Sequence, residues 1–69
     1  MTKSQMQLGK KIQRIRQELG KTQEEFAESV DISRTHMGHI EQGRKSPSLE
    51  LLEKIAKNLK IKVKDLIPY

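Results

Sequence analysis

Residues 22–43 read TQEEFAESVDISRTHMGHIEQG, and this stretch decides the fold. It opens with Thr22 and, three residues later, Glu25. This spacing is typical of a capping box, in which the hydroxyl and the carboxylate satisfy amide donors left free at a helix start. The stretch therefore predicts a short helix over about residues 23–30.

A second short helix follows almost at once. Ser33 is another cap candidate, and Gly43 is placed to end a helix over about residues 34–42. Because only residues 31–33 separate the two predicted helices, they cannot lie antiparallel and must cross steeply, as in a helix-turn-helix. The apolar residues of the stretch have the spacing that such a crossing needs: Phe26, Val30, Ile32, Met37 and Ile40, with the small Ala27 at the closest approach.

Helical patterns continue on both sides of this unit. Four apolar residues recur at helical spacing ahead of Gly20 and predict a helix over about residues 5–19: Leu8, Ile12, Ile15 and Leu19. After a linker, a fourth helix is predicted from Leu49, Leu52, Ile55, Ala56 and Leu59. A last short helix is predicted from Ile61, Val63, Leu66 and Ile67. The fold class is therefore all-α, a compact bundle of five short helices, with residues 1–4 disordered and residues 5–69 forming one domain.

Composition narrows the classes of function. The 69 residues contain no cysteine and only two histidines, which excludes disulfides and leaves a poor set of metal ligands, so no cofactor is expected. A net charge of +5 favours a polyanionic partner. No apolar run is long enough to cross a bilayer and the amino terminus lacks the pattern of a signal peptide, so we expect a cytoplasmic protein without a membrane partner.

Residues across nearly the whole chain resemble the phage repressor and Cro family of helix-turn-helix regulators. The resemblance is carried by residues 22–27, 32–34 and 40–43, and by the apolar pattern that follows Pro47. It implies a lambda-repressor-like domain that binds double-stranded DNA as a transcription regulator. One departure is Asp31, where the family usually has a glycine with positive φ; Asp tolerates that state better than most residues. Another is Gly38, which should cost about 1 kcal/mol relative to alanine inside a helix.

The exposed side of the second helix of the unit holds the candidate DNA-reading residues. With Met37 and Ile40 turned inward, the opposite arc contains Arg34, Thr35, Gly38, His39 and Gln42. The resemblance implies that three of these contact bases in the major groove: Arg34, Thr35 and His39. It implies phosphate contacts at Thr22 and Gln23. We expect Gln42, Arg44 and Lys45 to meet phosphates as well. Arg16 and Glu41 resemble a structural ion pair of the family.

Rival functions remain at this stage. An enzyme is disfavoured because no set of nucleophile, base and acid is evident. An antitoxin or adaptor that uses the same unit for protein contacts is disfavoured by the polar, aromatic-free face of the second helix. Non-specific DNA binding is disfavoured because no exposed apolar wedge is evident. Among regulators, the sequence does not distinguish a generic repressor from a controller protein of a restriction–modification system.

We expect the working form to be a homodimer, because one recognition helix reads too few base pairs to single out a site. The apolar residues of the predicted fourth helix suffice to cover the first three helices. The remaining apolar residues then predict a dimer interface at the carboxy-terminal end: Leu51, Leu66, Ile67, Pro68 and Tyr69. Some of these could instead belong to the core, and Leu66 is the first candidate to be shared with it. No small-molecule ligand is expected.

Overall fold

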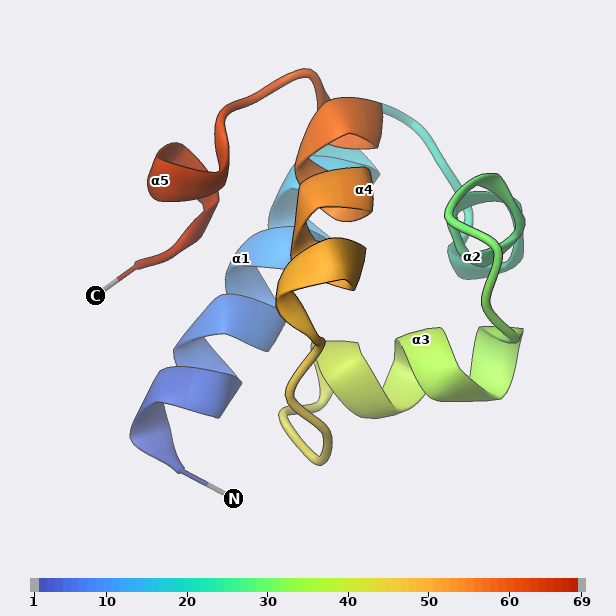
Figure 1. Cartoon of the computed structure of the whole chain (residues 1–69). Coiled ribbons are helices and arrows are strands. Elements are labelled where there is room, and N and C mark those ends of the chain that lie inside the picture. Colours follow the sequence, from blue (N-terminus) through green and yellow to red (C-terminus); the bar gives the residue numbers. More distant parts are fainter. Residues whose placement is uncertain (1, 69) are drawn as a thin grey trace.

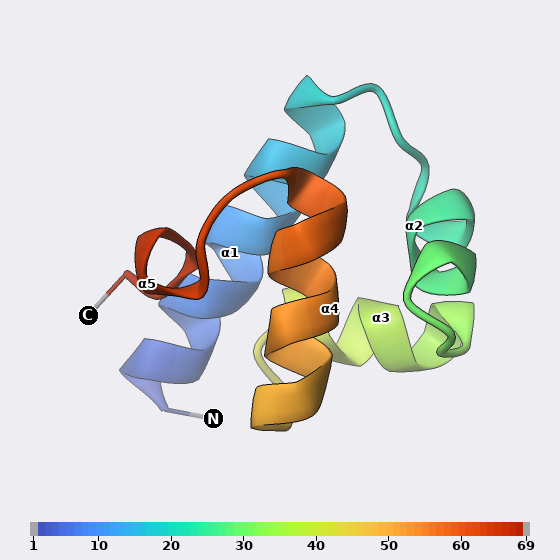
Figure 2. The ribbon, with the colours of Figure 1, turned by 45° about the horizontal axis from the view of Figure 1, so that its top comes forward.

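Five helices and no strand make up residues 2–68, the part of the chain that the computed structural model describes (Figure 1). They are α1 Lys3–Glu18, α2 Gln23–Ser29, α3 Arg34–Glu41, α4 Leu49–Leu59 and α5 Val63–Leu66. Figures 1 and 2 show α3 across one end of the bundle, with α2 beside its start and α1 near its end. The predicted all-α class and the order of the five helices are confirmed.

Helix α1 begins earlier than the sequence indicated. The Thr2 N–H donates to Gln5 Oε1 at 3.0 Å, and the Gln5 N–H donates to Thr2 Oγ1 at 3.1 Å. This capping box allows the helix to start at Lys3. The prediction of disorder was therefore wrong for residues 2–4, because a local cap was overlooked. Met1 lies outside the described residues.

One apolar core joins all five helices. The fully buried large side chains come from every helix or its capping residue: Leu8, Ile12, Phe26, Val30, Met37, Ile40, Ile55 and Leu66. Of the predicted inward residues of the helix-turn-helix unit, Phe26, Val30, Met37 and Ile40 are in this cluster, together with Ala27. Ile32 is half-buried and packs against it. Burial of these side chains is the main source of stability for α3, which is too short to be stable alone.

The predicted inner face of α4 was partly wrong. Leu49 is 65% exposed, whereas Leu51 is only 9% exposed and belongs to the core. The stripe that faces the core is Leu51, Ile55 and Leu59, at spacings of four residues. Ser48 caps the helix, so Leu49 is its first residue and points about 160° away from the core-facing Leu51.

The predicted dimer interface was wrong for two residues, because they are buried in the core. Leu51 and Leu66 are buried within the monomer and cannot serve as exposed interface residues. Ile67 is half-buried and Pro68 is exposed. Tyr69 lies outside the described residues. The error at Leu51 arose because the count of core residues assigned Leu49 to the interior in its place. Leu66 was the residue expected to be shared with the core, and it is fully buried.

The turn between α2 and α3 has the backbone that the family resemblance implied. Asp31 has φ of 62°, in the left-handed region. The Ile32 N–H donates to the Ala27 carbonyl oxygen at 3.0 Å, which closes the end of α2. Ser33 Oγ then accepts a hydrogen bond from the His36 N–H at 3.0 Å and starts α3. Within residues 2–68, none of the helices has both the length and the apolar composition required to span a bilayer.

Candidate nucleic-acid interface

Helix α3 has two chemically different sides. Its inner side consists of Met37, Ile40 and Glu41, all buried. On the opposite arc, the side chains of Arg34, Thr35 and Gln42 are exposed, and His39 is half-buried. The inner side of α3 therefore packs against the core, and the outer side exposes polar groups to solvent.

The outer arc of α3 borders an open groove of about 290 Å³. Its lining comes from the start of α2, from α3 and from the loop after it: Gln23, Arg34, Thr35, Gly38, His39, Gln42 and Arg44. The structure thus brings together the three expected base contacts and three of the five expected phosphate contacts. Thr22 and Lys45 do not line the groove, although both are exposed.

A buried ion pair fixes the carboxy-terminal end of α3. Arg16 Nε donates to Glu41 Oε2 at 2.8 Å, and a second guanidinium nitrogen donates to Glu41 Oε1 at 3.1 Å. The third nitrogen donates to the Lys21 carbonyl oxygen at 2.7 Å. The side chains of Arg16 and Glu41 are 8% and 1% exposed. This is the pair that the family resemblance implied, and it links α1, the loop before α2, and α3.

The side chain of Gln23 belongs to the same network. Its Nε2 donates to Glu41 Oε1 at 3.1 Å, a contact that the sequence analysis missed. The amide nitrogen of the side chain is therefore already engaged in the free protein. The expected phosphate contact at Gln23 can then come only from its backbone N–H or from the second hydrogen of its side-chain amide nitrogen.

Thr22 is also partly engaged. Its N–H donates to Glu25 Oε1 at 2.8 Å, and its Oγ1 accepts from the Glu25 N–H at 3.1 Å. The hydrogen bond from the Thr22 backbone holds the pKa of Glu25 below its ordinary value, with a further lowering by the Thr22 side chain. The Thr22 hydroxyl is the donor that a phosphate could engage, in competition with the adjacent Glu25 carboxylate.

Gly9 is a second residue whose role the sequence analysis missed. It is buried where α1 crosses the end of α3. A Cβ atom on Gly9 would lie 2.5 Å from the Glu41 carbonyl oxygen and closer still to that of Ile40. Only glycine lets the two backbones approach this closely. The available signal was a glycine next to Leu8 on the apolar face of a predicted helix.

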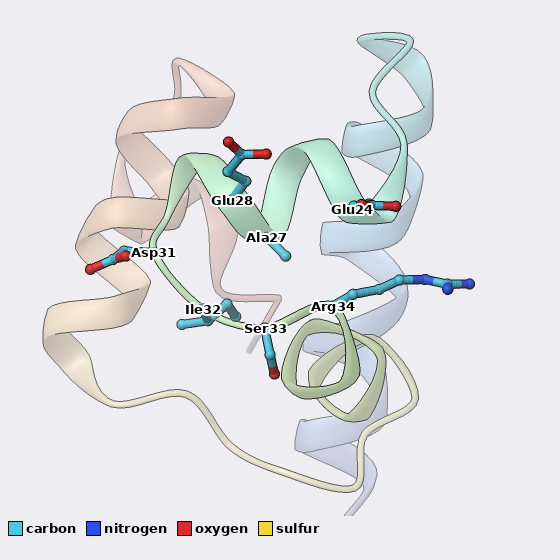
Figure 3. Close-up of a pocket in the computed structure, with 7 residues that line it drawn as sticks. All are labelled: Glu24, Ala27, Glu28, Asp31, Ile32, Ser33 and Arg34. Carbon is cyan, nitrogen blue, oxygen red and sulfur yellow. The ribbon is translucent and has the colours of Figure 1, made fainter.

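Acidic residues flank the groove on the α2 side. Figure 3 shows a hollow at the turn, with the carboxylates of Glu24 and Glu28 on the exposed side of α2. The Arg34 side chain extends away from the turn toward the end of α2 where Glu24 lies. Arg34 lines both this hollow and the groove over α3. Arg34 therefore lies between the acidic exposed side of α2 and the groove over α3, which is lined by hydrogen-bond donors.

The steep pairing of α2 and α3 and the polar groove define a helix-turn-helix regulator. The helix-turn-helix family profile matches residues 12–66. The chain therefore belongs to the helix-turn-helix family and is a DNA-binding transcription regulator.

Individual relatives agree with this assignment. The chain is 39% identical over 62 residues to the immunity repressor protein of Bacillus phage phi105, covering 90% of this chain but only 43% of that repressor. It is 37% identical over 62 residues to control protein C.BamHI of Bacillus amyloliquefaciens, covering 88% and 76% of the two chains. Among solved structures, the clp gene regulator ClgR from Corynebacterium glutamicum superposes with a TM-score of 0.89 at 31% identity, covering 94% of this chain and 69% of ClgR.

Proposed function

We propose that the chain binds a palindromic operator as a homodimer, with α3 of each subunit in the major groove. The observation that carries this proposal is the groove over α3, because it gathers donor-rich side chains on the exposed side of a helix whose other side is locked to the core. An α-helix fits the major groove of B-DNA, which is about 12 Å wide.

Arg34 is the principal base-reading residue of the proposal. It is exposed at the first turn of α3, and a guanidinium can donate two parallel hydrogen bonds to guanine O6 and N7. Thr35 offers a methyl group to thymine or a hydroxyl to a phosphate, and His39 can donate or accept. These three side chains line one groove, so they would meet neighbouring base pairs.

Phosphate contacts are assigned to both ends of the groove. Arg44 and Lys45 are exposed directly after α3, and Gln42 lies beside them. At the other end, the Thr22 hydroxyl and the backbone N–H of Gln23 remain as donors, since a helix start leaves amides without partners. The carboxylates of Glu24 and Glu25 lie next to these donors and would weaken the attraction.

The dimer interface is assigned to the carboxy-terminal end of the chain. Ile67 and Pro68 retain apolar surface there, and Tyr69 follows them in the sequence. Removal of residues 67–69 should lower both dimerisation, measured by sedimentation, and operator affinity. A shortened chain that still sediments as a dimer would place the interface elsewhere.

Selection of binding sites from random duplex DNA tests the proposal as a whole. We expect a palindrome whose half-site centres lie about 34–36 Å apart, one helical turn of DNA. Recovery of single asymmetric sites would contradict the dimeric arrangement. Recovery of no preferred sequence would contradict sequence-specific reading.

The similarity to control protein C.BamHI, and to the solved restriction-modification controller protein C.AhdI from Aeromonas hydrophila, favours a regulator encoded with a restriction–modification system. The similarity to an immunity repressor covers less than half of that protein and supports only the DNA-binding part of its role. Methyltransferase and nuclease genes next to the gene for this chain would support the controller role. A phage gene cluster would instead support a repressor.

A further inference from the structure

The groove over α3 has a gap in its lining at Gly38. A Cβ atom added to Gly38 would meet only the Gln23 side chain, with the amide Oε1 at 3.6 Å and Nε2 at 3.8 Å. These are ordinary van der Waals distances, so an alanine would fit. Glycine nevertheless occupies the position, although it is among the residues least favourable to a helix interior. The missing side chain leaves the Gln23 amide open to the groove.

The buried ion pair decides which atom of that amide faces Gly38. Gln23 Nε2 donates to Glu41 Oε1, and an ionised carboxylate can only accept hydrogen bonds. The amide nitrogen must therefore point toward Glu41 and the amide oxygen away from it. Glu41 is itself held by two hydrogen bonds from Arg16. Within residues 2–68, Gln23 Oε1 accepts no hydrogen bond, and it is the atom nearest to the gap.

An acceptor without a hydrogen-bond partner in this place has a defined partner chemistry. The surrounding groove is rich in donors, from Arg34 and Arg44 among others. In the major groove, the only base atoms that donate are the N6 amino group of adenine and the N4 amino group of cytosine. Guanine and thymine present acceptor oxygens there, which a carbonyl oxygen would repel.

We propose that Gly38 and Gln23 together form a reading slot, in which Gln23 Oε1 accepts a hydrogen bond from the exocyclic amino group of an adenine or a cytosine. The inference rests on the proposed function, because it needs α3 in the major groove. Every base pair carries one such amino group, on one of its two strands. On the strand that it faces, the slot therefore favours adenine or cytosine over guanine or thymine. It does so at an operator position separate from that read by Arg34.

Binding-site selection with Gly38→Ala and Gln23→Ala tests the slot. Gly38→Ala fills the gap, and Gln23→Ala removes the acceptor. Both variants should lose about tenfold in preference at one and the same operator position, because a mismatched base pair typically costs about that much or more. The preference at the position read by Arg34 should persist. Gly38→Ala should also unfold at a temperature no lower than the wild type, so its effect cannot be attributed to unfolding.

Asn58→Ala is the matched control, because Asn58 lies on α4 and does not line the groove. It should select the wild-type operator. If Gly38→Ala and Gln23→Ala relax different positions, or weaken binding equally on all sequences, the slot is overturned while the proposed function stands. If the wild type selects no sequence at all, the proposed function and the slot fall together.

Discussion

The inner and outer sides of α3 differ in how completely their polar groups are satisfied. On the inner side, the buried Glu41 carboxylate accepts two hydrogen bonds from Arg16 and one from Gln23. On the outer side, the side chains of Arg34 and Thr35 make no hydrogen bond within residues 2–68. Folding therefore satisfies the buried polar groups on the inner side of α3. The donors on the outer side remain available to a binding partner.

The largest expected effect is on the inner side. Glu41→Ala leaves the Arg16 guanidinium buried without its counter-charge, which should cost about 3–5 kcal/mol of unfolding free energy. A core in a chain of this size seldom supplies more than about 3–5 kcal/mol. We therefore expect the variant to be largely unfolded at room temperature in chemical denaturation followed by circular dichroism.

The double variant Arg16→Met, Glu41→Leu is the control for this prediction. It removes both charges together, so it should recover much of the lost stability. Folding of Glu41→Ala with wild-type stability would show that the pair does not hold α3.

The same glycine-to-alanine change should act oppositely on the two sides of α3. Gly9→Ala places a methyl group against the backbone of Ile40 and Glu41, and overpacking of this kind costs about 1–3 kcal/mol. Gly38→Ala faces open groove and should gain up to about 1 kcal/mol from helix propensity. Thermal unfolding of the two variants measures the difference, and equal shifts in Tm would show that the α1 crossing is not tight.

Arg34→Ala should separate binding from folding. The loss of a base contact should cost about 1–3 kcal/mol of operator affinity and relax one position of each half-site. Stability should change by less than about 0.5 kcal/mol, because the side chain is exposed. Titration of the selected duplex against variants at each position gives the measurement. If the affinity instead falls equally for all DNA sequences, Arg34 contacts a phosphate and not a base.

The smallest expected effect concerns the cap of α2. The pKa of Glu25 is lower in the folded protein than its ordinary value, because Thr22 donates to the ionised carboxylate. Ionised Glu25 therefore stabilises the fold at pH values above the ordinary pKa of a glutamate, and this contribution is lost as the pH falls through the lowered value. Glu25→Gln keeps the acceptor but not the charge. Its small deficit in stability should be present at neutral pH and vanish in acid, whereas a deficit independent of pH would contradict the assignment.

Helix starts were predictable because their signals are local. The Thr22–Glu25 box and the Ser33 cap each lie within one turn of the residues that they satisfy, and both are present. Thr2 and Gln5 carry the same kind of signal and could have been found. The positive φ of Asp31 was also expected, because the family that the chain resembles usually has a glycine at this position of the turn.

Packing between distant helices was not predictable in the same way. Helical spacing alone allowed Leu49 or Leu51 to face the core, and the choice depends on where α4 lies against its neighbours. The contacts of Gly9 with α3 depend on the angle at which two helices cross, which no local pattern specifies. The outer arc of α3 was found because its inner residues, Met37 and Ile40, were recognised first.

Backbone amide chemical shifts during titration test most directly whether the outer side of α3 is the DNA-binding surface. Isotope-labelled wild-type protein is titrated with the selected duplex and, separately, with a shuffled duplex of the same composition. We predict that the largest changes specific to the selected duplex fall on α3, around Arg34 and Gly38, and on the start of α2. Changes concentrated in α4 and α5, with α3 unaffected, would contradict the account.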